Sequence, residues 1–218
     1  MVVESDYYSR VIDKLEIEDW HNVIDIGCGN GLHSLQAGLK HPINLIDIDI
    51  DLISLGKLKK QIRSTSSSRS SNCLYVCADA LKLPFPHSYF DRAICSLVFC
   101  LLPWSLALAE LQRIMKPGGK VYLRTPMLSF SRVLVIFRHS KNIRDSIYRV
   151  SQVFSGLCYT IIGYQFPNLI NRHDKWACYI PKNQFEKAVL RAGFQIEYLD
   201  VAYSRYKEPS IDAQLMKL

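Results

Sequence analysis

The sequence lacks the cysteine pattern of a secreted or zinc-binding protein. Its seven cysteines are an odd number, and no two of them form a Cys-x-x-Cys pair. Such spacing is typical of reduced thiols, so we expect a cytoplasmic protein with no disulfide framework and no metal site. Cysteines in apolar surroundings usually act as small buried hydrophobic residues rather than as nucleophiles.

Long hydrophobic runs are also missing. The first ten residues, MVVESDYYSR, carry acidic side chains and no apolar core, which argues against a secretory signal peptide. Uninterrupted apolar runs, such as residues 133–137, are far shorter than the roughly 18 residues that indicate a membrane span. We therefore expect no transmembrane segment.

The overall composition is that of an ordinary globular protein. Hydrophobic residues make up 49% of the chain and charged residues 22%, which excludes a disordered, collagen-like or coiled-coil protein. The 218 residues favour a single domain, because a typical domain has about 150. A chain of this length buries enough surface to fold without disulfides or metal ions.

Apolar runs alternate with helical stripes along the chain. The predicted strands are residues 23–26, 43–48, 73–77, 92–97, 120–124 and 195–202. Helices are predicted around residues 7–15, 32–39, 52–58, 106–115 and 181–192, and the polar stretch RSTSSSRSSN at 63–72 predicts a loop. This alternation indicates a doubly wound α/β fold, whose parallel strands are buried on both faces.

Residues 127–175 interrupt the alternation and are both basic and apolar. They contain 7 Lys and Arg against 2 Asp and Glu, in a chain of net charge +7. Apolar residues recur at helical spacing at Ile143, Ile147, Val150 and Phe154. We interpret 127–175 as an insertion that covers a single domain of residues 1–218.

A glycine-rich turn follows the first predicted strand. Gly27, Gly29 and Gly31 let backbone amides approach a ligand at the carboxyl edge of the sheet, where ligands of such folds bind. Position 32 is leucine, so the dinucleotide pattern G-x-G-x-x-G is absent and NAD binding loses support. Asp25 precedes the turn, and its charge suits a cationic ligand with an ammonium group better than a pyrophosphate.

Several motifs in order resemble the class I S-adenosylmethionine-dependent methyltransferases, and within them the type 11 or UbiE-like small-molecule group. The matching segments are VIDIGCGNG at 23–31, CADALKLPF at 77–85, LAELQRIMKPGGKVYL at 108–123 and AGF at 192–194. The resemblance implies a Rossmann-like, mostly parallel sheet of seven strands with a helical lid after the fifth strand. It also implies S-adenosyl-L-methionine as the cofactor.

The resemblance assigns cofactor contacts by position. The glycine loop would cradle the methionine part, an acid after the second strand would bind the ribose hydroxyls, and an acid after the third strand would recognise the adenine. The predicted cofactor-binding residues are Asp25, Gly27, Cys28, Gly29, Asp49, Ile50, Asp79, Ala80 and Cys95, with Ser96 beside the last. Asp47 competes with Asp49, because both lie on one face of the strand, but Asp49 is nearer its end.

The methyl acceptor is less constrained. Substrate groups are expected from the first helix, the end of the fourth strand and the insertion, which offer Tyr7, Tyr8, Leu97, Trp104, Arg138, His139, His173 and Trp176. His173 and His139 are candidate catalytic bases, because imidazole titrates near neutral pH, although either could be a histidine without a chemical role. The histidines at 21, 33, 41 and 87 are interpreted as structural or exposed.

The insertion leaves several functions open. Apolar faces beside cations fit a lid over a small molecule with an apolar body and an anionic end, such as an isoprenoid acid or a quinone precursor. The same residues fit a lid packed onto the core with solvated arginines, or a helix at a membrane surface.

A pI near 9.0 also permits an RNA methyltransferase. Against RNA, the excess charge is confined to one segment and no Asn-Pro-Pro-Tyr sequence is present. A non-catalytic cofactor-binding protein is the remaining alternative.

Overall fold

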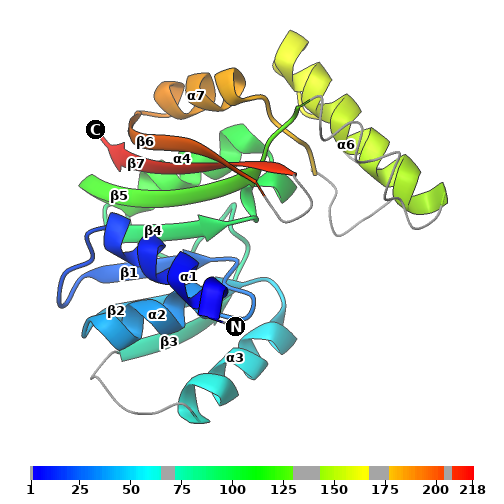
Figure 1. Cartoon of the computed structure of the whole chain (residues 1–218). Helices are drawn as coiled ribbons and strands as arrows, with labels where there is room; N and C mark the ends of the chain where they lie inside the picture. The colour runs from blue at the N-terminus through cyan, green and yellow to red at the C-terminus, as the bar shows by residue number, and fades with distance from the viewer. Residues whose placement is uncertain (1, 65–71, 130–142, 167–176, 204–207) are drawn as a thin grey trace.

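A single sheet runs through the computed structural model, which describes residues 2–64, 72–129, 143–166, 177–203 and 208–218 (Figure 1). Its seven strands have the order β3-β2-β1-β4-β5-β7-β6. They are β1 (Asn22–Ile26), β2 (Asn44–Asp49), β3 (Asn72–Cys77), β4 (Phe90–Ser96), β5 (Met115–Pro126), β6 (Phe194–Tyr203) and β7 (Pro209–Lys217). Only β7 runs antiparallel to its neighbours, so the predicted α/β fold with a mostly parallel sheet is confirmed.

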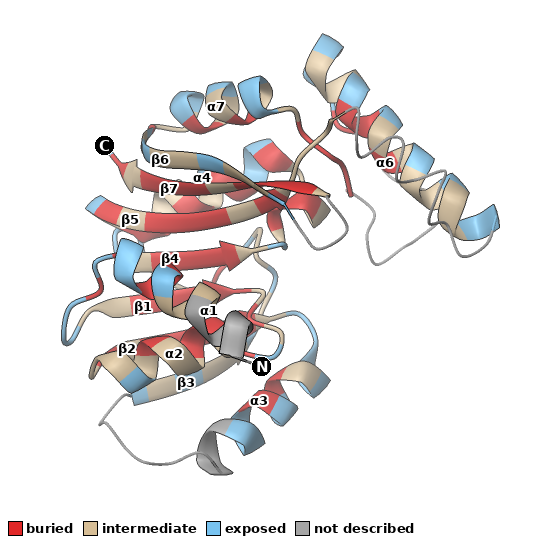
Figure 2. Ribbon diagram, viewed as in Figure 1, coloured by how far each residue is buried: buried red, intermediate tan, exposed pale blue. Residues whose placement is uncertain are grey.

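Helices cover both faces of the sheet. They are α1 (Val2–Lys14), α2 (Leu32–Lys40), α3 (Leu52–Ser64), α4 (Trp104–Ile114), α6 (Ile143–Ile162) and α7 (Lys182–Arg191), with a short 3-10 turn at η1 (Phe99–Leu101). Val23 packs with α1 and α2, whereas its neighbour Ile24 belongs to the cluster under α4 and α7. Alternate residues of a central strand thus pack into two cores on opposite faces of the sheet. This explains the nearly continuous burial along the central strands (Figure 2).

Two strands, β5 and β7, differ from the sequence prediction. The fifth strand begins at Met115 rather than at 120, because Met115 already pairs with Phe90 before the register shifts and Lys120 pairs with Arg92. Strand β7 has no counterpart among the six strands predicted from the pattern, although the seven-stranded sheet implied by the resemblance contains it.

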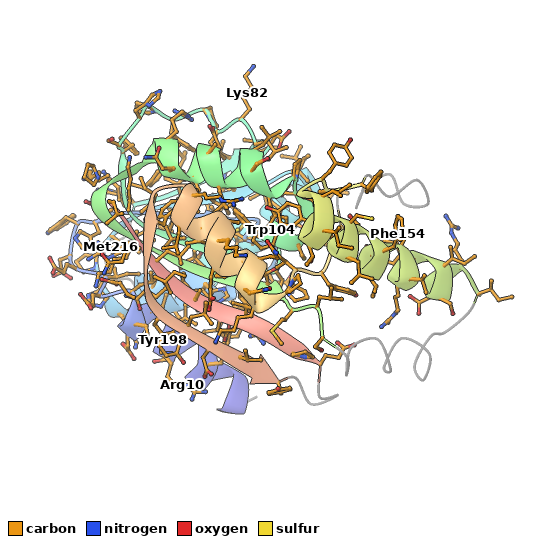
Figure 3. The ribbon with its side chains drawn as sticks, turned by 90° about the horizontal axis from the view of Figure 1, so that it is seen from above. Arg10, Lys82, Trp104, Phe154, Tyr198 and Met216 are labelled. Atoms are coloured by element: carbon orange, nitrogen blue, oxygen red, sulfur yellow. The ribbon has the colours of Figure 1, made fainter. Side chains whose placement is uncertain are left out.

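Helix α6 carries the helical stripe predicted within residues 127–175. It projects from the body of the domain, beside α7 (Figure 1), and the view from above shows it reaching past the sheet with Phe154 along it (Figure 3). The bounds of the insertion stay a prediction, because 130–142 and 167–176 lie outside the described residues. Within the described parts of the chain, no helix is long and apolar enough to cross a membrane.

The carboxyl ends of four parallel strands meet at one edge. Strands β1, β2, β3 and β4 end at Ile26, Asp49, Cys77 and Ser96. The chain order reverses between β1 and β4, since β2 and β3 lie on one side of β1 and the later strands on the other. Ligands of open α/β sheets bind in the crevice at such a switch point, so the loops after β1 and β4 are the place to look for a site.

Candidate functional site

The loop after β1 is held against the end of β2. The N–H groups of Gly27 and Cys28 donate to the carbonyl oxygen of Ile48 at 2.7 and 2.9 Å. A Cβ atom added to Gly27 would lie 2.1 Å from Cγ2 of Val98, whereas one added to Gly29 would meet no heavy atom within 4 Å. Gly27 is therefore required by packing, while Gly29 faces open space.

That open space is a cavity of about 230 Å³ at the switch point of the sheet. Four predicted cofactor residues line it, namely Asp25, Gly27, Cys28 and Gly29. The rest of the lining is Tyr8, Asn30, Gly31, Leu32, His33 and Ser96. The structure thus brings the glycine loop, the end of β4 and helix α1 together around one space.

Asp49 links the end of β2 to the glycine loop. Its Oδ2 accepts the N–H of Gly29 at 3.0 Å, and its Oδ1 accepts the N–H of Asp51 at 2.9 Å. Each carboxylate oxygen has more than one acceptor site, so the half-buried side chain can still accept hydroxyl groups of a ligand. The neighbouring Ile50 is 75% exposed and could cover a flat group lying beside it.

Asp79 follows the next strand. The N–H of Ala78 donates to the backbone oxygen of Asp49 at 3.2 Å, which places the two acids at neighbouring strand ends. Asp79 is exposed and accepts the N–H of Leu81 at 2.9 Å, while Ala80 packs against the main core. The geometry is that of two carboxylates presented along one edge beside the cavity.

Beneath the loop, Asp25 and Asp47 are buried together around one serine. Oγ of Ser34 lies 2.9 Å from Oδ2 of Asp25 and also contacts Oδ1 of Asp47. A serine has one O–H to donate, so holding both contacts requires a proton on one of the two carboxyl groups. Burial, followed by the charge of Asp47, raises the pKa of Asp25 to about 8, whereas burial raises that of Asp47 to about 6.

These pKa values correct the interpretation of Asp25. In the absence of a ligand its carboxyl group carries a proton at neutral pH, because burial disfavours its charge, so it does not present a permanent negative charge. Asp47 is wholly buried and is inaccessible to a ligand at the edge, and its Oδ2 has no partner among the described residues. Asp49 is the more accessible of the two competing acids.

An aromatic wall closes the side of the cavity under α1. The ring of His33 lies 4.7 Å from that of Tyr8 and 6.0 Å from that of Tyr7, measured between centroids. Tyr7 in turn shares a 2.6 Å hydrogen bond between its hydroxyl and that of Tyr122. The guanidinium of Arg124 lies 4.8 Å from the centroid of the Tyr7 ring, which ties α1 to β5.

His33 is the residue that the sequence interpretation undervalued. It lines the cavity and is only 8% exposed, and its Nε2 has no hydrogen-bond partner in the part of the chain that the structure describes. Burial, and then the charge of Arg124, lowers the pKa of His33 to about 4, so the ring is neutral at physiological pH. Its position two residues after Gly31 was the available signal, since the first turn of a helix that follows such a loop faces the ligand.

Other predicted residues lie elsewhere. Cys95 is wholly buried in the main core, so its side chain does not border the cavity as predicted, and Ser96 does. Trp104 packs between Phe99 and Phe185 at 1% exposure, which corrects its assignment as a substrate contact. The candidate bases His139 and His173, with Arg138 and Trp176, lie outside the described residues.

Leu97 directly follows Ser96 of the cavity lining and has an unusual conformation. It follows β4, is 50% exposed and has a φ of 64°, a left-handed value that non-glycine residues rarely adopt. Its N–H donates to the backbone oxygen of Arg124 at 2.8 Å, which holds the turn in place. Strained residues of this kind concentrate at binding sites, in agreement with its predicted place on the substrate side.

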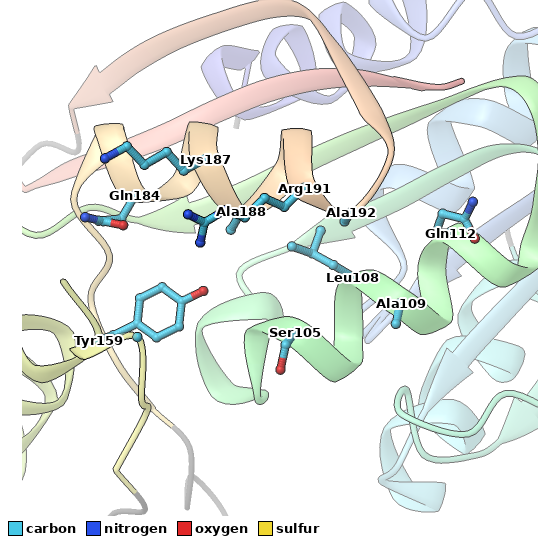
Figure 4. A pocket seen from close by; sticks show the side chains of 11 residues that line it. Ser105, Leu108, Ala109, Gln112, Tyr159, Gln184, Lys187, Ala188, Arg191 and Ala192 are labelled. Atoms are coloured by element: carbon cyan, nitrogen blue, oxygen red, sulfur yellow. The ribbon is translucent and has the colours of Figure 1, made fainter. Parts of the chain in front are cut away.

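A larger cavity of about 510 Å³ lies between α4, α6 and α7 (Figure 4). Its lining includes Leu108, Tyr159, Gln184, Lys187 and Arg191, none of which was predicted as a site residue. It has neither a glycine loop nor acids at strand ends, so it does not offer the contacts described above. Among the described residues, no group of three or more His, Cys, Asp and Glu side chains could hold a metal ion.

Comparison with known proteins gives concordant results. Residues 24–123 match the family described as "Methyltransferase domain". A ubiquinone/menaquinone biosynthesis C-methyltransferase of Vibrio vulnificus is 31% identical over 140 residues, which are 61% of this chain and 46% of that protein. The chain thus spans about half the length of the curated relatives it matches.

Solved structures share the fold over almost the whole chain. A methyltransferase of Methanosarcina mazei superimposes with a TM-score of 0.72 at 20% identity, covering 95% of this chain and 97% of that one. Magnesium protoporphyrin IX methyltransferase of Synechocystis with bound S-adenosylhomocysteine gives a TM-score of 0.69 at 16% identity, covering 100% of this chain and 84% of that one.

Proposed function

We propose that this chain is a class I S-adenosylmethionine-dependent methyltransferase and that it methylates a small molecule with an apolar body. The match of residues 24–123 to a methyltransferase domain and the order of the strands support this proposal. The observation that carries the proposal is the cavity above Gly29, flanked by the carboxylate of Asp49. A glycine that faces open space and donates its N–H to an acid at the next strand end fits the amino-acid and ribose parts of this cofactor.

Each half of the cofactor has matching residues on this chain. Gly29 leaves room for the methionine part, and Asp25 lies where a cationic group would favour loss of its buried proton. Asp49 would accept the ribose hydroxyls, and Asp79 the adenine amino group. When bound, S-adenosylmethionine supplies a methyl group activated by a positive sulfur. The protein's part is then to align that methyl group with the acceptor.

The acceptor would approach along the wall of Tyr8, His33 and Ser96. This wall is aromatic and holds a neutral imidazole, which suits an apolar molecule. The name of the Vibrio relative, a quinone-biosynthesis C-methyltransferase, favours a quinone precursor and a carbon acceptor over RNA. His139 and His173 stay the predicted bases, and an anionic end of the acceptor stays a prediction.

Calorimetric titration with S-adenosylmethionine and S-adenosylhomocysteine tests the proposal first. Micromolar binding of both is expected, followed by transfer of labelled methyl to at least one member of a panel of phenols, quinone precursors and isoprenoid acids. If neither compound binds at millimolar concentration, the enzymatic function is refuted. Binding of both ligands with transfer only to RNA would replace the small-molecule acceptor by a nucleic acid.

Asp49→Ala is expected to weaken S-adenosylmethionine binding by about 1 to 3 kcal/mol, roughly 5- to 150-fold in Kd, because a charged hydrogen-bond partner is lost. Asp51→Ala is the matched control. Asp51 bonds the N–H groups of Ile53 and Ser54 within α3 and not the glycine loop. Equal weakening by both substitutions would attribute the effect to net charge and remove Asp49 from the ribose site.

A further inference from the structure

Helix α6 exposes a continuous row of apolar side chains. These residues, named here the apolar stripe, are between 46% and 80% exposed (Figure 2) and are Ile143, Ile147, Val150, Phe154, Leu157 and Ile161. Their spacing alternates between four and three residues, so they lie along one face of the helix. At 1.5 Å per residue the row is about 27 Å long.

The opposite face of α6, which contacts the domain, has small and polar buried residues, and Tyr159 packs beside them against the main core. Gln152, Ser155 and Gly156 are its buried residues. A Cβ atom at Gly156 would lie 1.9 Å from the carbonyl oxygen of Tyr179, so the helix approaches the domain backbone closely there. Because an ordinary surface helix turns its apolar face inward, the orientation of α6 is reversed and leaves a large apolar surface exposed, where Phe166, at 6.1 Å between ring centroids, lies beside Phe154.

An ion-pair network fixes this orientation. Arg149 lies 3.1 Å from Asp145 one turn away and 3.8 Å from Glu208, which precedes β7. These pairs hold the polar side of α6 toward the sheet. The stripe is therefore presented outward by contacts of the helix itself.

The segment that contains the stripe carries an excess of positive charge in its sequence. Arg144 is exposed at the start of the helix, and residues 127–175, which contain α6, carry 7 Lys and Arg against 2 Asp and Glu. Beyond the other end, Tyr164 and Phe166 are 53% and 38% exposed. This combination matches an anionic lipid surface. The acyl chains would take up the apolar and aromatic side chains, and the anionic headgroups would attract the cations.

We propose that the apolar stripe of α6 docks this protein onto an anionic membrane surface, with the helix lying along the headgroup region. The helix lies on the membrane because it is not apolar enough to cross it. This docking goes beyond methyl transfer and requires neither cofactor nor acceptor. It would bring the site at the carboxyl edge close to apolar molecules dissolved in the bilayer.

Charge favours a lipid surface over a second copy of the chain. Two copies paired through the stripe would bring together two segments that each carry an excess of five positive charges. The positions that flank the stripe hold Arg144 and uncharged residues at 146, 151, 153, 158 and 160, so a facing copy offers Arg144 no acidic partner there. An anionic surface supplies the negative charge that a second copy lacks.

Vesicle flotation of the full chain tests the docking. Vesicles of phosphatidylcholine with roughly one third phosphatidylglycerol are compared with phosphatidylcholine alone, at about 0.05 M and about 0.5 M NaCl. Binding is expected to the anionic vesicles at low salt, and to fall at least about fivefold at high salt or without the anionic lipid. Absence of binding at low salt, or equal binding to both vesicles, overturns the proposal.

Paired variants locate the contact. Phe154→Ser with Ile161→Ser removes two exposed stripe residues and should reduce partitioning about tenfold or more, with unchanged thermal unfolding. Leu106→Ser with Leu190→Ser removes residues of 58% and 57% exposure on α4 and α7, and should bind like the wild type. Wild-type binding by the stripe variant refutes the proposal. So does a dimer in sedimentation that the stripe variant abolishes while vesicles remain unbound, because the occupant is then a second copy.

Discussion

Gly29→Leu is expected to abolish binding of S-adenosylmethionine while the protein stays folded. The new Cβ would meet no protein atom within 4 Å, so the leucine side chain extends into the cavity that the cofactor's methionine part would fill. The φ of 51° at Gly29 costs a leucine about 1 to 2 kcal/mol, which a domain of this size tolerates. Calorimetric titration and thermal unfolding measure the two effects separately.

Gly27→Ala provides the contrasting control. Its Cβ would lie 2.1 Å from Cγ2 of Val98, and its φ is 67°. Overpacking of 1 to 3 kcal/mol and the left-handed backbone together predict a loss of about 2 to 5 kcal/mol of stability, seen as a lower Tm. Wild-type affinity in Gly29→Leu would contradict the placement of the cofactor, and equal destabilisation by both substitutions would show that Gly29 is needed for folding instead.

Local patterns predicted the part of the fold that holds the site. Apolar runs that end in Gly27 and Asp49 indicated two parallel strands, and β1 and β2 pair in register from Asn22 with Asn44. The period of two placed Asp47 and Asp49 on one face, which the structure shows. Nothing local indicated that Ser34 would join Asp25 to Asp47, because that contact depends on how α2 packs over the strands.

Strand β7 escaped prediction because its polar residues are satisfied by distant partners. Gln214 donates to Glu197 at 2.9 Å, and Nζ of Lys217 donates to the backbone oxygen of Met115 at 2.8 Å. Both residues are buried, although the sequence presents them as a polar chain end. The partners are 17 and 102 positions away in the sequence, so a pattern of neighbouring residues cannot reveal these hydrogen bonds.

Helical periodicity revealed the stripe of α6 but not the side to which it turns. Spacing at Ile143, Ile147 and Val150 shows that these residues share a face, and one interpretation had that face packed onto the core. All three are exposed, because Gly156 and its polar neighbours make the contact with the domain instead. His33 was undervalued for a similar reason, since its burial comes from α1 lying against α2.

Asp25→Asn is expected to remove most of the pH dependence of folding stability between about pH 6.5 and 8. An aspartate titrates near 3.9 in an unfolded chain, whereas the pKa of Asp25 in the fold is about 8. Between these values the folded state binds the extra proton. This stabilisation is therefore complete below about pH 4 and is lost as the pH rises through 8, at up to about 1.4 kcal/mol per pH unit.

The window from pH 6.5 to 8 separates Asp25 from His33 and Asp47. Burial raises the pKa of the thiols of Cys28, Cys95 and Cys178, which act mainly above the window because a thiol in an unfolded chain titrates near about 8.5. The pKa of His33 is lowered to about 4 and that of Asp47 is raised to about 6, so both groups change the folding stability mainly below that window. Asparagine does not titrate, and its amide N–H can donate to Oγ of Ser34 as the protonated carboxyl group of Asp25 does. Urea unfolding across the window should show wild-type stability falling with pH and a nearly flat variant; parallel slopes would contradict the buried proton.

The same proton should report cofactor binding. A cationic ligand in the cavity favours the charged form of Asp25, so at pH 7 binding of S-adenosylmethionine should release up to about one proton. Calorimetry in two buffers of different ionisation enthalpy counts that proton. Asp25→Asn should release almost none, whereas Asp51→Asn, which changes an exposed acid that bonds N–H groups within α3, should release as much as the wild type. Equal release by the wild type and Asp25→Asn would mean that the cation lies elsewhere, and the glycine loop would then bind the ligand through its backbone alone.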